Sequence, residues 1–314
     1  MATLKKASSQ ADVPKIGYIR NVSGPTSVDQ AFRRELLDLG YVRDHNIFIE
    51  ERFAGRNPVT LKESVEELLN DKVKVIVALD PPASRELLRP EHKTADRGIP
   101  MVIRSDSEFD PKKRVKNVTG LVELSNSPPL FGKRLQLLKE VAPQLSHLVL
   151  IYNSSTPPNA TERYGNDGYV TKTLKTGFGD LKINSSNVTD IGSFERFFKG
   201  RSLSETGLIV VRNAFILENK ETIFNLAVKY KTPAIYTDQE FVEAGGLLSY
   251  GTDEADLFRQ AASYVDRILN GAKPEDLPMR QALRFELCIN LSTAKRMGLS
   301  IPPTTLMLAD KVVK

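Results

Sequence analysis

The 314-residue sequence lacks tryptophan and contains one cysteine, Cys288. A single cysteine excludes an intramolecular disulfide, and the mostly apolar stretch 285–289 around it indicates a small buried hydrophobic residue. The three histidines, His45, His92 and His147, lie far apart in the sequence. Because metal sites draw on clustered ligands, the sequence predicts no metal site.

Long apolar runs are also absent. No stretch of about 18 apolar residues occurs, so we expect no membrane-spanning helix. The first 13 residues are polar and lack the apolar core of a signal peptide. Two interpretations stay open at this point: a cytosolic protein, or an exported protein whose signal has been removed.

The sequence also lacks a strong excess of charged residues of one sign. The 44 basic and 39 acidic residues are interspersed and give a formal net charge of +5. Nucleic-acid binding needs a basic stripe on a recognisable module, and neither is present, so we expect no nucleic-acid partner. The G-x-G-x-x-G, Walker A, H-E-x-x-H and G-x-S-x-G motifs are absent as well. These absences favour a protein that is not an enzyme and holds no cofactor.

What the sequence does contain is an alternation of short β-rich runs and amphipathic stretches. The first series predicts strands at 15–19, 46–53, 73–79, 99–103 and 118–122, with helices at 27–39, 60–69 and 82–88. The second series predicts strands at 147–152, 180–183, 208–211 and 234–236, with helices at 132–141, 160–175, 193–198 and 220–230. Strict alternation predicts an α/β fold in which helices cover both faces of parallel sheets, and two series predict two similar lobes.

The C-terminal part breaks this rhythm. We expect a strand at 246–249, a long helix at 254–269 and a polar link at 271–278. A strand near 283–289 and helical pieces at 292–297 and 304–313 complete the chain.

Polar loops follow the predicted strands. In open parallel sheets ligands bind beyond the carboxyl ends of the strands, so these loops are the expected ligand site. The candidates are Arg20, Asn21, Ser23, Asp80, Ala83, Ser84, Ser105, Asp106, Asn153, Ser154, Ser155, Arg212 and Asn213. Ser84 and Ser154-Ser155 are placed to hold an anion at a helix N-terminus, and helix capping alone is the competing interpretation.

Ordered blocks along almost the whole chain resemble one family. The blocks are 35–42 leading into 46–50, then 117–121, 132–140, 233–236, 240–251, 264–274, and 290–295 leading to 301–303. In their order and spacing, the chain resembles the ABC transporter substrate-binding proteins of the TrpX-like group, which have the type I periplasmic binding protein fold. The resemblance implies two Rossmann-like lobes joined by three hinge crossovers.

The same resemblance implies domain limits and partners. Residues 1–14 would be a disordered tail, 15–121 with 246–272 the first lobe, and 122–245 with 273–314 the second lobe. It implies the solute-binding subunit of an ABC importer, which closes two lobes around a small molecule and meets a membrane permease. A monomer in the periplasm or another extracytoplasmic space is implied, once a signal peptide has been removed.

One departure from the family bears on the ligand. Amino-acid-binding members typically carry an acidic residue in the loop where this chain has Arg212-Asn213. An arginine cannot hold an ammonium but can clamp a carboxylate with two hydrogen bonds. We therefore expect a carboxylate-bearing ligand, with an aromatic group stacked on Phe215, Tyr236 or Phe241. Phe215 could equally belong to the core.

Two other functions are compatible with a two-lobed α/β scaffold. A ligand-sensing domain of a regulator or receptor would share the fold, but a DNA-binding regulator needs a helix-turn-helix before residue 16, and a receptor needs an adjoining membrane span. An enzyme on the same scaffold would turn its ligand over.

Overall fold

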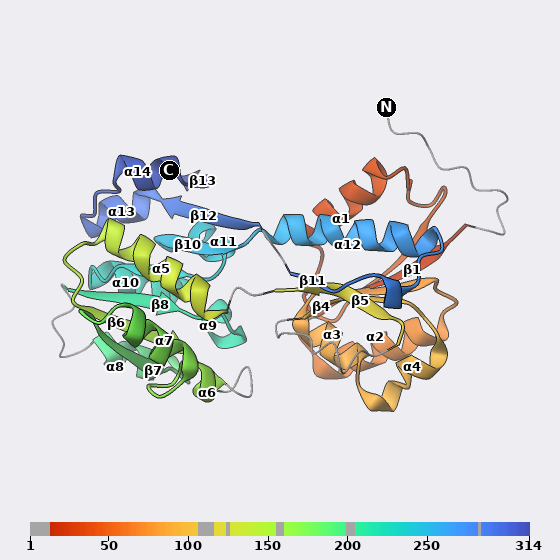
Figure 1. Cartoon of the computed structure of the whole chain (residues 1–314), viewed down its shortest axis with the longest axis horizontal. Helices are drawn as coiled ribbons and strands as arrows, with labels where there is room; N and C mark the ends of the chain where they lie inside the picture. Colours follow the sequence, from red (N-terminus) through yellow and green to blue (C-terminus); the bar gives the residue numbers. More distant parts are fainter. Residues whose placement is uncertain (1–12, 106–115, 124–125, 155–159, 199–204, 282–283) are drawn as a thin grey trace. The chain divides into compact units, whose positions relative to one another are not determined.

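The structure is a computed structural model that describes residues 13–105, 116–123, 126–154, 160–198, 205–281 and 284–314. The chain divides into two compact units (Figure 1). The first unit comprises residues 1–124 and 253–284, and the second comprises 125–252 and 285–314. The predicted α/β fold is confirmed, and each unit is built around its own parallel sheet.

The first unit holds a six-stranded sheet with the order β11-β5-β4-β3-β1-β2, and all its neighbouring strands are parallel. Its strands are β1 (Lys15–Arg20), β2 (Phe48–Phe53), β3 (Val75–Ala78), β4 (Met101–Ser105), β5 (Val118–Val122) and β11 (Arg280–Gln281). The order around β1 reverses between β1 and β3, and such a switch point is where open α/β sheets bind ligands.

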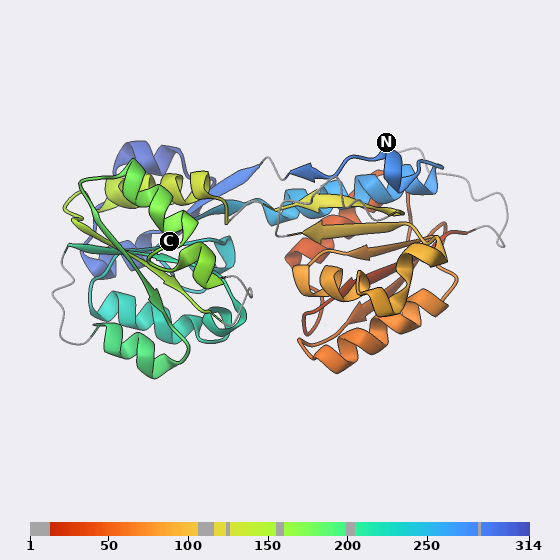
Figure 2. The same cartoon turned by 60° about the horizontal axis from the view of Figure 1, so that its bottom comes forward.

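Helices cover both faces of this sheet (Figure 2). Val75 and Val77 of β3 pack with α1 (Ser27–Asp38) and α12 (Glu254–Leu269). Ile76 and Ala78 point to the opposite face, because side chains alternate along a strand, and pack with α2 (Pro58–Asn70) and α3 (Pro81–Leu87). Cover on both faces explains why β3 is a continuous apolar run. The 3-10 helices η2 (Pro90–His92) and η4 (Pro274–Asp276) and the short α4 (Thr94–Arg97) complete the unit.

The second unit holds a seven-stranded sheet with the order β13-β12-β10-β9-β8-β6-β7. Its strands are β6 (His147–Tyr152), β7 (Lys182–Asn187), β8 (Thr206–Val210), β9 (Ala234–Tyr236), β10 (Leu248–Thr252), β12 (Phe285–Asn290) and β13 (Lys311–Val313). The β10–β12 pair is antiparallel and the others are parallel. Strand order reverses between β6 and β8, so this unit has a switch point of its own.

Two layers of helices enclose the second sheet as well. One layer consists of α5 (Pro128–Val141), α6 (Ala160–Tyr164), α7 (Tyr169–Gly177), α13 (Leu291–Met297) and α14 (Pro303–Met307). The other consists of α8 (Ile191–Phe198), α9 (Ala214–Glu218), α10 (Lys220–Lys229) and α11 (Gln239–Glu243). The short helices α9 and α11 were not expected from the sequence.

Two expected helices differ from the structure. The helix expected at 160–175 is split into α6 and α7 by a turn at Gly165 and Gly168, where a Cβ on Gly168 would lie 2.5 Å from the carbonyl oxygen of Arg163. The prediction of a helical piece at 304–313 was wrong for the second half of that range. Residues 311–313 form β13 instead, because Asp310 accepts a hydrogen bond from the Leu287 amide at 2.9 Å and so places the chain end beside β12.

Two segments lie in a different unit from the one expected. Residues 248–252 were expected in the first lobe, but β10 pairs with β9 and β12 in the second sheet. Residues 273–281 were expected in the second lobe, but β11 pairs with β5 in the first sheet, and Thr119 Oγ1 donates to Leu277 O at 2.8 Å. The expected disordered tail, 1–14, falls almost wholly outside the described residues.

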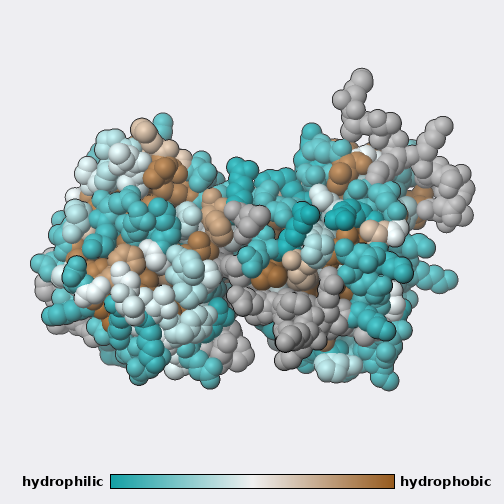
Figure 3. All heavy atoms as spheres, viewed as in Figure 1, coloured by the Kyte–Doolittle hydropathy of each residue, from teal (hydrophilic) through white to brown (hydrophobic). Residues whose placement is uncertain are grey.

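Cys288 lies buried on β12, opposite Ser249 of β10. Burial, and next the nearby Glu286 carboxylate, raise the pKa of its thiol to about 11. Hydrophilic residues predominate on the face drawn in Figure 3, where hydrophobic ones form small separate groups. Among the described residues, no helix is long and apolar enough to cross a membrane.

Candidate functional site

The switch point of the first unit is organised by Asp80, which follows β3. Its Oδ1 accepts a hydrogen bond from the Ala83 amide at 2.9 Å and so caps α3. Its Oδ2 accepts from the Asn21 amide at 2.7 Å and from Arg20 Nε at 3.1 Å. The carboxylate therefore ties the end of β1 to the start of α3.

The side chain of Arg20 is buried in the first unit and contacts residues of that unit. Its Nη1 donates to Asp29 Oδ1 at 2.7 Å, and its guanidinium lies 4.7 Å from the centre of the Phe258 ring. Only 6% of Arg20 is exposed. Burial raises the pKa of Asp29, but the Arg20 charge and the hydrogen bonds from Thr26 outweigh burial and leave that pKa below its ordinary value. Arg20 and Asp80 thus bind one another, and their other contacts are to residues of the same unit.

Ser84 is engaged in the same way. Its Oγ donates to Ala78 O at 2.9 Å and accepts from the Arg104 amide at 3.3 Å. The side chain is buried, so its hydroxyl links β3, α3 and β4. The N-terminus of α3 is capped by Asp80. Helix capping therefore describes this segment better than an anion site at Ser84 does.

Asn21 and Ser23 are the more accessible candidates in this loop. Ser23 is exposed, and Asn21 is half-buried. Asn21 Oδ1 is buried and has no hydrogen-bond partner in the part of the chain that the structure describes. Ser105 ends β4, and Asp106 lies outside the described residues.

Arg104, on β4, is a charged residue that the sequence did not single out. Its Nη2 donates to Glu254 Oε1 at 2.8 Å and also to Glu123, and its side chain is buried. Burial works against the charged form, but the two carboxylates raise the pKa of Arg104 above its ordinary value. The guanidinium joins the end of β5 to the first turn of α12.

The switch point of the second unit carries a cluster of opposite charges. Arg212 follows β8, and its Nη1 lies 3.3 Å from Asp238 Oδ1 and its Nη2 3.7 Å from Glu240 Oε2. Lys220 Nζ lies 3.3 Å from Glu240 Oε1. The side chain of Arg212 is 33% exposed, whereas Asp238 is 9% exposed. The acidic partners come from the segment after β9, which lies beside β8 in the sheet: Asp238 precedes α11 and Glu240 lies in its first turn.

Asn213 and Asn153 have local partners. Asn213 Oδ1 caps α9 by accepting from the Ile216 amide at 2.9 Å. Asn153 Nδ2 donates to Val188 O at 2.8 Å. Ser154 Oγ accepts from Asn187 Nδ2 at 2.8 Å, and its amide donates to Asn187 Oδ1. Ser155 lies outside the described residues.

The three candidate aromatic residues lie in or against the core of the second unit. Tyr236 and Phe241 stack on one another with ring centres 5.4 Å apart, and at most 1% of either is exposed. Burial raises the pKa of the Tyr236 hydroxyl above its ordinary value. Phe215 is half-buried and packs against the same cluster. Core packing is therefore the role that the structure assigns to the first two rings.

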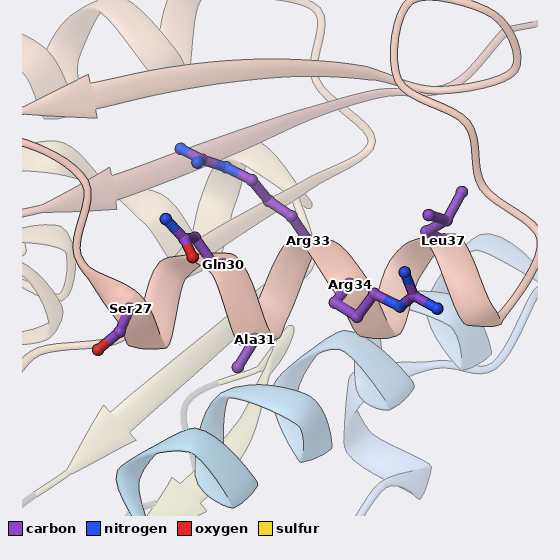
Figure 4. Close-up of a pocket in the computed structure, with 6 residues that line it drawn as sticks. All are labelled: Ser27, Gln30, Ala31, Arg33, Arg34 and Leu37. Carbon is purple, nitrogen blue, oxygen red and sulfur yellow. The ribbon is translucent and has the colours of Figure 1, made fainter.

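An open hollow on the outer side of α1 lies away from these loops (Figure 4). It is lined by Ser27, Gln30, Ala31, Arg33, Arg34 and Leu37. Arg33 extends from it toward β2, where its Nε donates to Glu51 at 2.8 Å. None of the sequence candidates lines this hollow.

Two doubly wound sheets, each with polar loops at its own switch point, define a two-lobed binding protein with the type I periplasmic binding protein fold. The chain belongs to the ABC transporter substrate binding protein family, which it matches over residues 15–313.

Individual relatives agree with this membership. The chain is 23% identical to a tyrosine-binding protein of Clostridioides difficile (strain R20291), over 94% of this chain and 84% of that protein. It is similar to an ABC domain in complex with L-Trp from Streptococcus pneumonia, with a TM-score of 0.74, 21% identity, and 96% and 99% of the two chains covered. It is also similar to a ligand-free, open substrate binding protein with adhesive properties from Clostridium difficile, with a TM-score of 0.75, 22% identity, and 96% and 100% covered.

Proposed function

We propose that this protein captures a small carboxylate-bearing solute between its two lobes and delivers it to an ABC permease from an extracytoplasmic space. It carries out no chemistry on the solute and acts as a monomer. Family membership supports the partnership with a permease. The nature of the solute is argued from the charges at the switch point of the second unit.

Arg212 is the observation that carries the carboxylate proposal. Its contacts to Asp238 and Glu240 measure 3.3 and 3.7 Å, longer than the 2.7 Å of the buried Arg20–Asp29 pair. Its side chain is one-third exposed. A planar guanidinium forms its strongest pairs with two parallel hydrogen bonds to one carboxylate, and these contacts do not provide them. A ligand carboxylate that forms two such bonds would compete with Glu240 for this guanidinium.

Asp238 and Glu240 modify the expectation drawn from the sequence. The loop after β8 lacks an acidic residue, but the segment after β9 supplies two beside Arg212: Asp238 just before α11 and Glu240 in the first turn of α11. A site with both signs of charge suits a zwitterion, whose ammonium would meet the acids while its carboxylate meets Arg212. α-Amino acids are thus included in the proposed ligand class together with simple organic acids. The names of two relatives, which mention tyrosine and L-Trp, support this breadth.

Lobe closure is the proposed mechanism. A ligand that contacts both lobes stabilises the closed form by the contacts that only this form provides. Asn21 and Ser23 are the accessible groups that the first lobe would contribute, and Arg212 is the charged group from the second. The permease would then recognise the closed form.

A thermal-shift screen followed by calorimetry tests the proposal. The screen contains α-amino acids, aromatic acids and sugars, because a tight ligand raises the melting temperature by mass action. We expect hits among the carboxylates, and each should be recovered unchanged after incubation. Arg212→Ala should weaken their binding by about tenfold or more, because charged hydrogen bonds contribute roughly 1.5–3 kcal/mol.

Arg196→Ala is the matched control for Arg212→Ala. Arg196 is exposed on α8 of the same unit, so its loss should leave the affinity unchanged. Equal affinities for Arg212→Ala and the wild type would remove Arg212 from the site. Hits confined to sugars would overturn the carboxylate class.

A further inference from the structure

Charged residues lie beside each of the places where the chain passes between the two units. These passages, called here the first, second and third connections, lie between residues 124 and 125, 252 and 253, and 284 and 285. Glu123 precedes the first connection, and Arg284 precedes the third. Asp253 and Glu254 follow the second. All four residues belong to the first unit, so the contacts among them are set within that unit.

Arg104 of β4 joins the first connection to the second. Its Nε donates to Glu123 Oε2 at 2.9 Å, and its Nη2 donates to Glu254 Oε1 at 2.8 Å. Glu123 is also held through its backbone, because its amide donates to Ser105 O at 2.8 Å. The side chain of Arg104 is only 5% exposed, so dissolved salt screens these pairs little. One buried cation therefore binds the residues beside two connections at once.

Asp253 joins the second connection to the third in two ways. Its amide donates to Arg284 O at 2.9 Å, and its Oδ2 lies 3.2 Å from Arg284 Nε. Its Oδ1 accepts from the Asp256 amide at 2.8 Å and so caps α12. The Asp253 carboxylate thus binds the start of α12 and the residue before the third connection together.

The first and third connections are joined by the first sheet itself. β5 and β11 are parallel neighbours, and Gln281 lies opposite Val122 at the end of both strands. Each connection therefore has a link to both of the others within the first unit. Moving one connection by itself would break at least one of these links.

We propose that Arg104 and Asp253 couple the three connections, so that the two units move relative to one another along one path instead of several. This coupling rests on the proposed solute capture for its use, since it limits the forms among which a solute selects. A protein that samples fewer forms loses less conformational entropy when it binds. Arg104 and Asp253 are positioning residues in this scheme, because they act through the connections.

Residual dipolar couplings of backbone amides test the coupling in a weakly aligned sample without solute. Units that move together share one alignment, whereas a unit that moves independently loses part of its own. The test variant combines Glu254→Ala with Arg284→Met, which removes one ion pair from each of the two charged links. Arg104 keeps Glu123 as a partner in this variant, and the side chain of Arg284 is 63% exposed, so we expect the variant to fold.

The ratio of the two units' alignment magnitudes is the measured quantity. It should be near unity in the wild type and fall clearly below unity in the combined variant. Arg259→Met is the matched control, because Arg259 pairs with Asp253 and Asp256 at the start of its own helix and links no two connections. Its ratio should stay near unity.

Circular dichroism and melting temperatures identify a variant that misfolds, and Arg284→Met alone then carries the test. A loss of stability without a change in the alignment ratio would mean that the ion pairs only stabilise the first unit, and this result overturns the coupling. A ratio already well below unity in the wild type overturns it as well. Because no solute is present, failure of every solute in the wider screen would contradict the capture function and leave this measurement unaffected.

Discussion

Arg20 Nε donates to Asp80 Oδ2 at 3.1 Å, across the point where β1 and β3 lie side by side in the first sheet. The same carboxylate oxygen accepts from the Asn21 amide, and the same guanidinium pairs with Asp29. One cation therefore neutralises two buried acids at the switch point. This arrangement fixes the loop that presents Asn21 and Ser23.

The first prediction concerns the cation itself. Arg20→Met should lower the free energy of unfolding by about 3–5 kcal/mol, because removing one partner leaves buried carboxylates uncompensated. Urea unfolding at pH 7 measures the change. Arg34→Met is the control, because Arg34 pairs with Asp38 on the exposed surface of α1, and exposed pairs contribute only about 0–1 kcal/mol. Equal effects of the two substitutions would show that the buried pairing does not stabilise the fold.

The second prediction concerns pH. The pKa of Asp29 is held below its ordinary value of 3.8 in the folded protein. A carboxyl group whose pKa falls on folding stabilises the folded state above its unfolded pKa, and this contribution is lost as the pH falls through the folded pKa. At pH 7 the free energy of unfolding should therefore be larger for the wild type than for Asp29→Asn. This difference in free energy should shrink below about pH 4.

Urea unfolding at a series of pH values between 7 and 2.5 measures this difference. Asp38→Asn is the matched control, since Asp38 is exposed on the same helix and should show almost no difference at any pH. A difference between wild type and Asp29→Asn that stays constant down to the lowest pH would contradict the ionic role of Asp29.

The third prediction concerns Gly120 in β5. Its φ is +145°, and an added Cβ would lie 1.9 Å from the carbonyl oxygen of Ile103 on the paired strand β4. Gly120→Ala should therefore destabilise the protein by more than about 2 kcal/mol, through strain and overpacking against backbone. Thermal and urea unfolding measure the loss. Gly24→Ala should be nearly neutral, because nothing lies within 4 Å of its added Cβ. A stable Gly120→Ala protein would mean that β4 and β5 separate more easily than their pairing indicates.

The elements of the first unit were predictable because each carries a strong local pattern. Residues 73–79 are apolar throughout, and β3 (Val75–Ala78) is buried on both faces. Residues 27–39 have one apolar stripe, and α1 ends one residue before the predicted limit. The C-terminal segments were harder, because β11 and β13 contain only two and three residues. Such strands are fixed by pairing with distant partners and carry no periodicity of their own.

The site was predictable as a set of loops but not as a set of contacts. The sequence identified Arg20 and Asp80 as polar residues after strands, yet their pairing joins positions 60 residues apart. Asp238 approaches Arg212 only because β9 lies beside β8 in the sheet. Tyr236 and Phe241 were expected to stack on an aromatic ligand, whereas both rings lie in the core of the second unit. Burial of this kind depends on tertiary packing that residue types do not encode locally.

The burial of Cys288 has a practical consequence for measuring lobe motion. Nucleophilic attack on a maleimide requires an accessible thiolate, and this thiol is buried with a pKa raised to about 11. The native cysteine should therefore stay unlabelled while engineered surface cysteines, one on each unit, take up a donor and an acceptor dye. Energy transfer between the dyes would then report on the separation of the two units with and without solute, in a protein whose own cysteine has not been replaced.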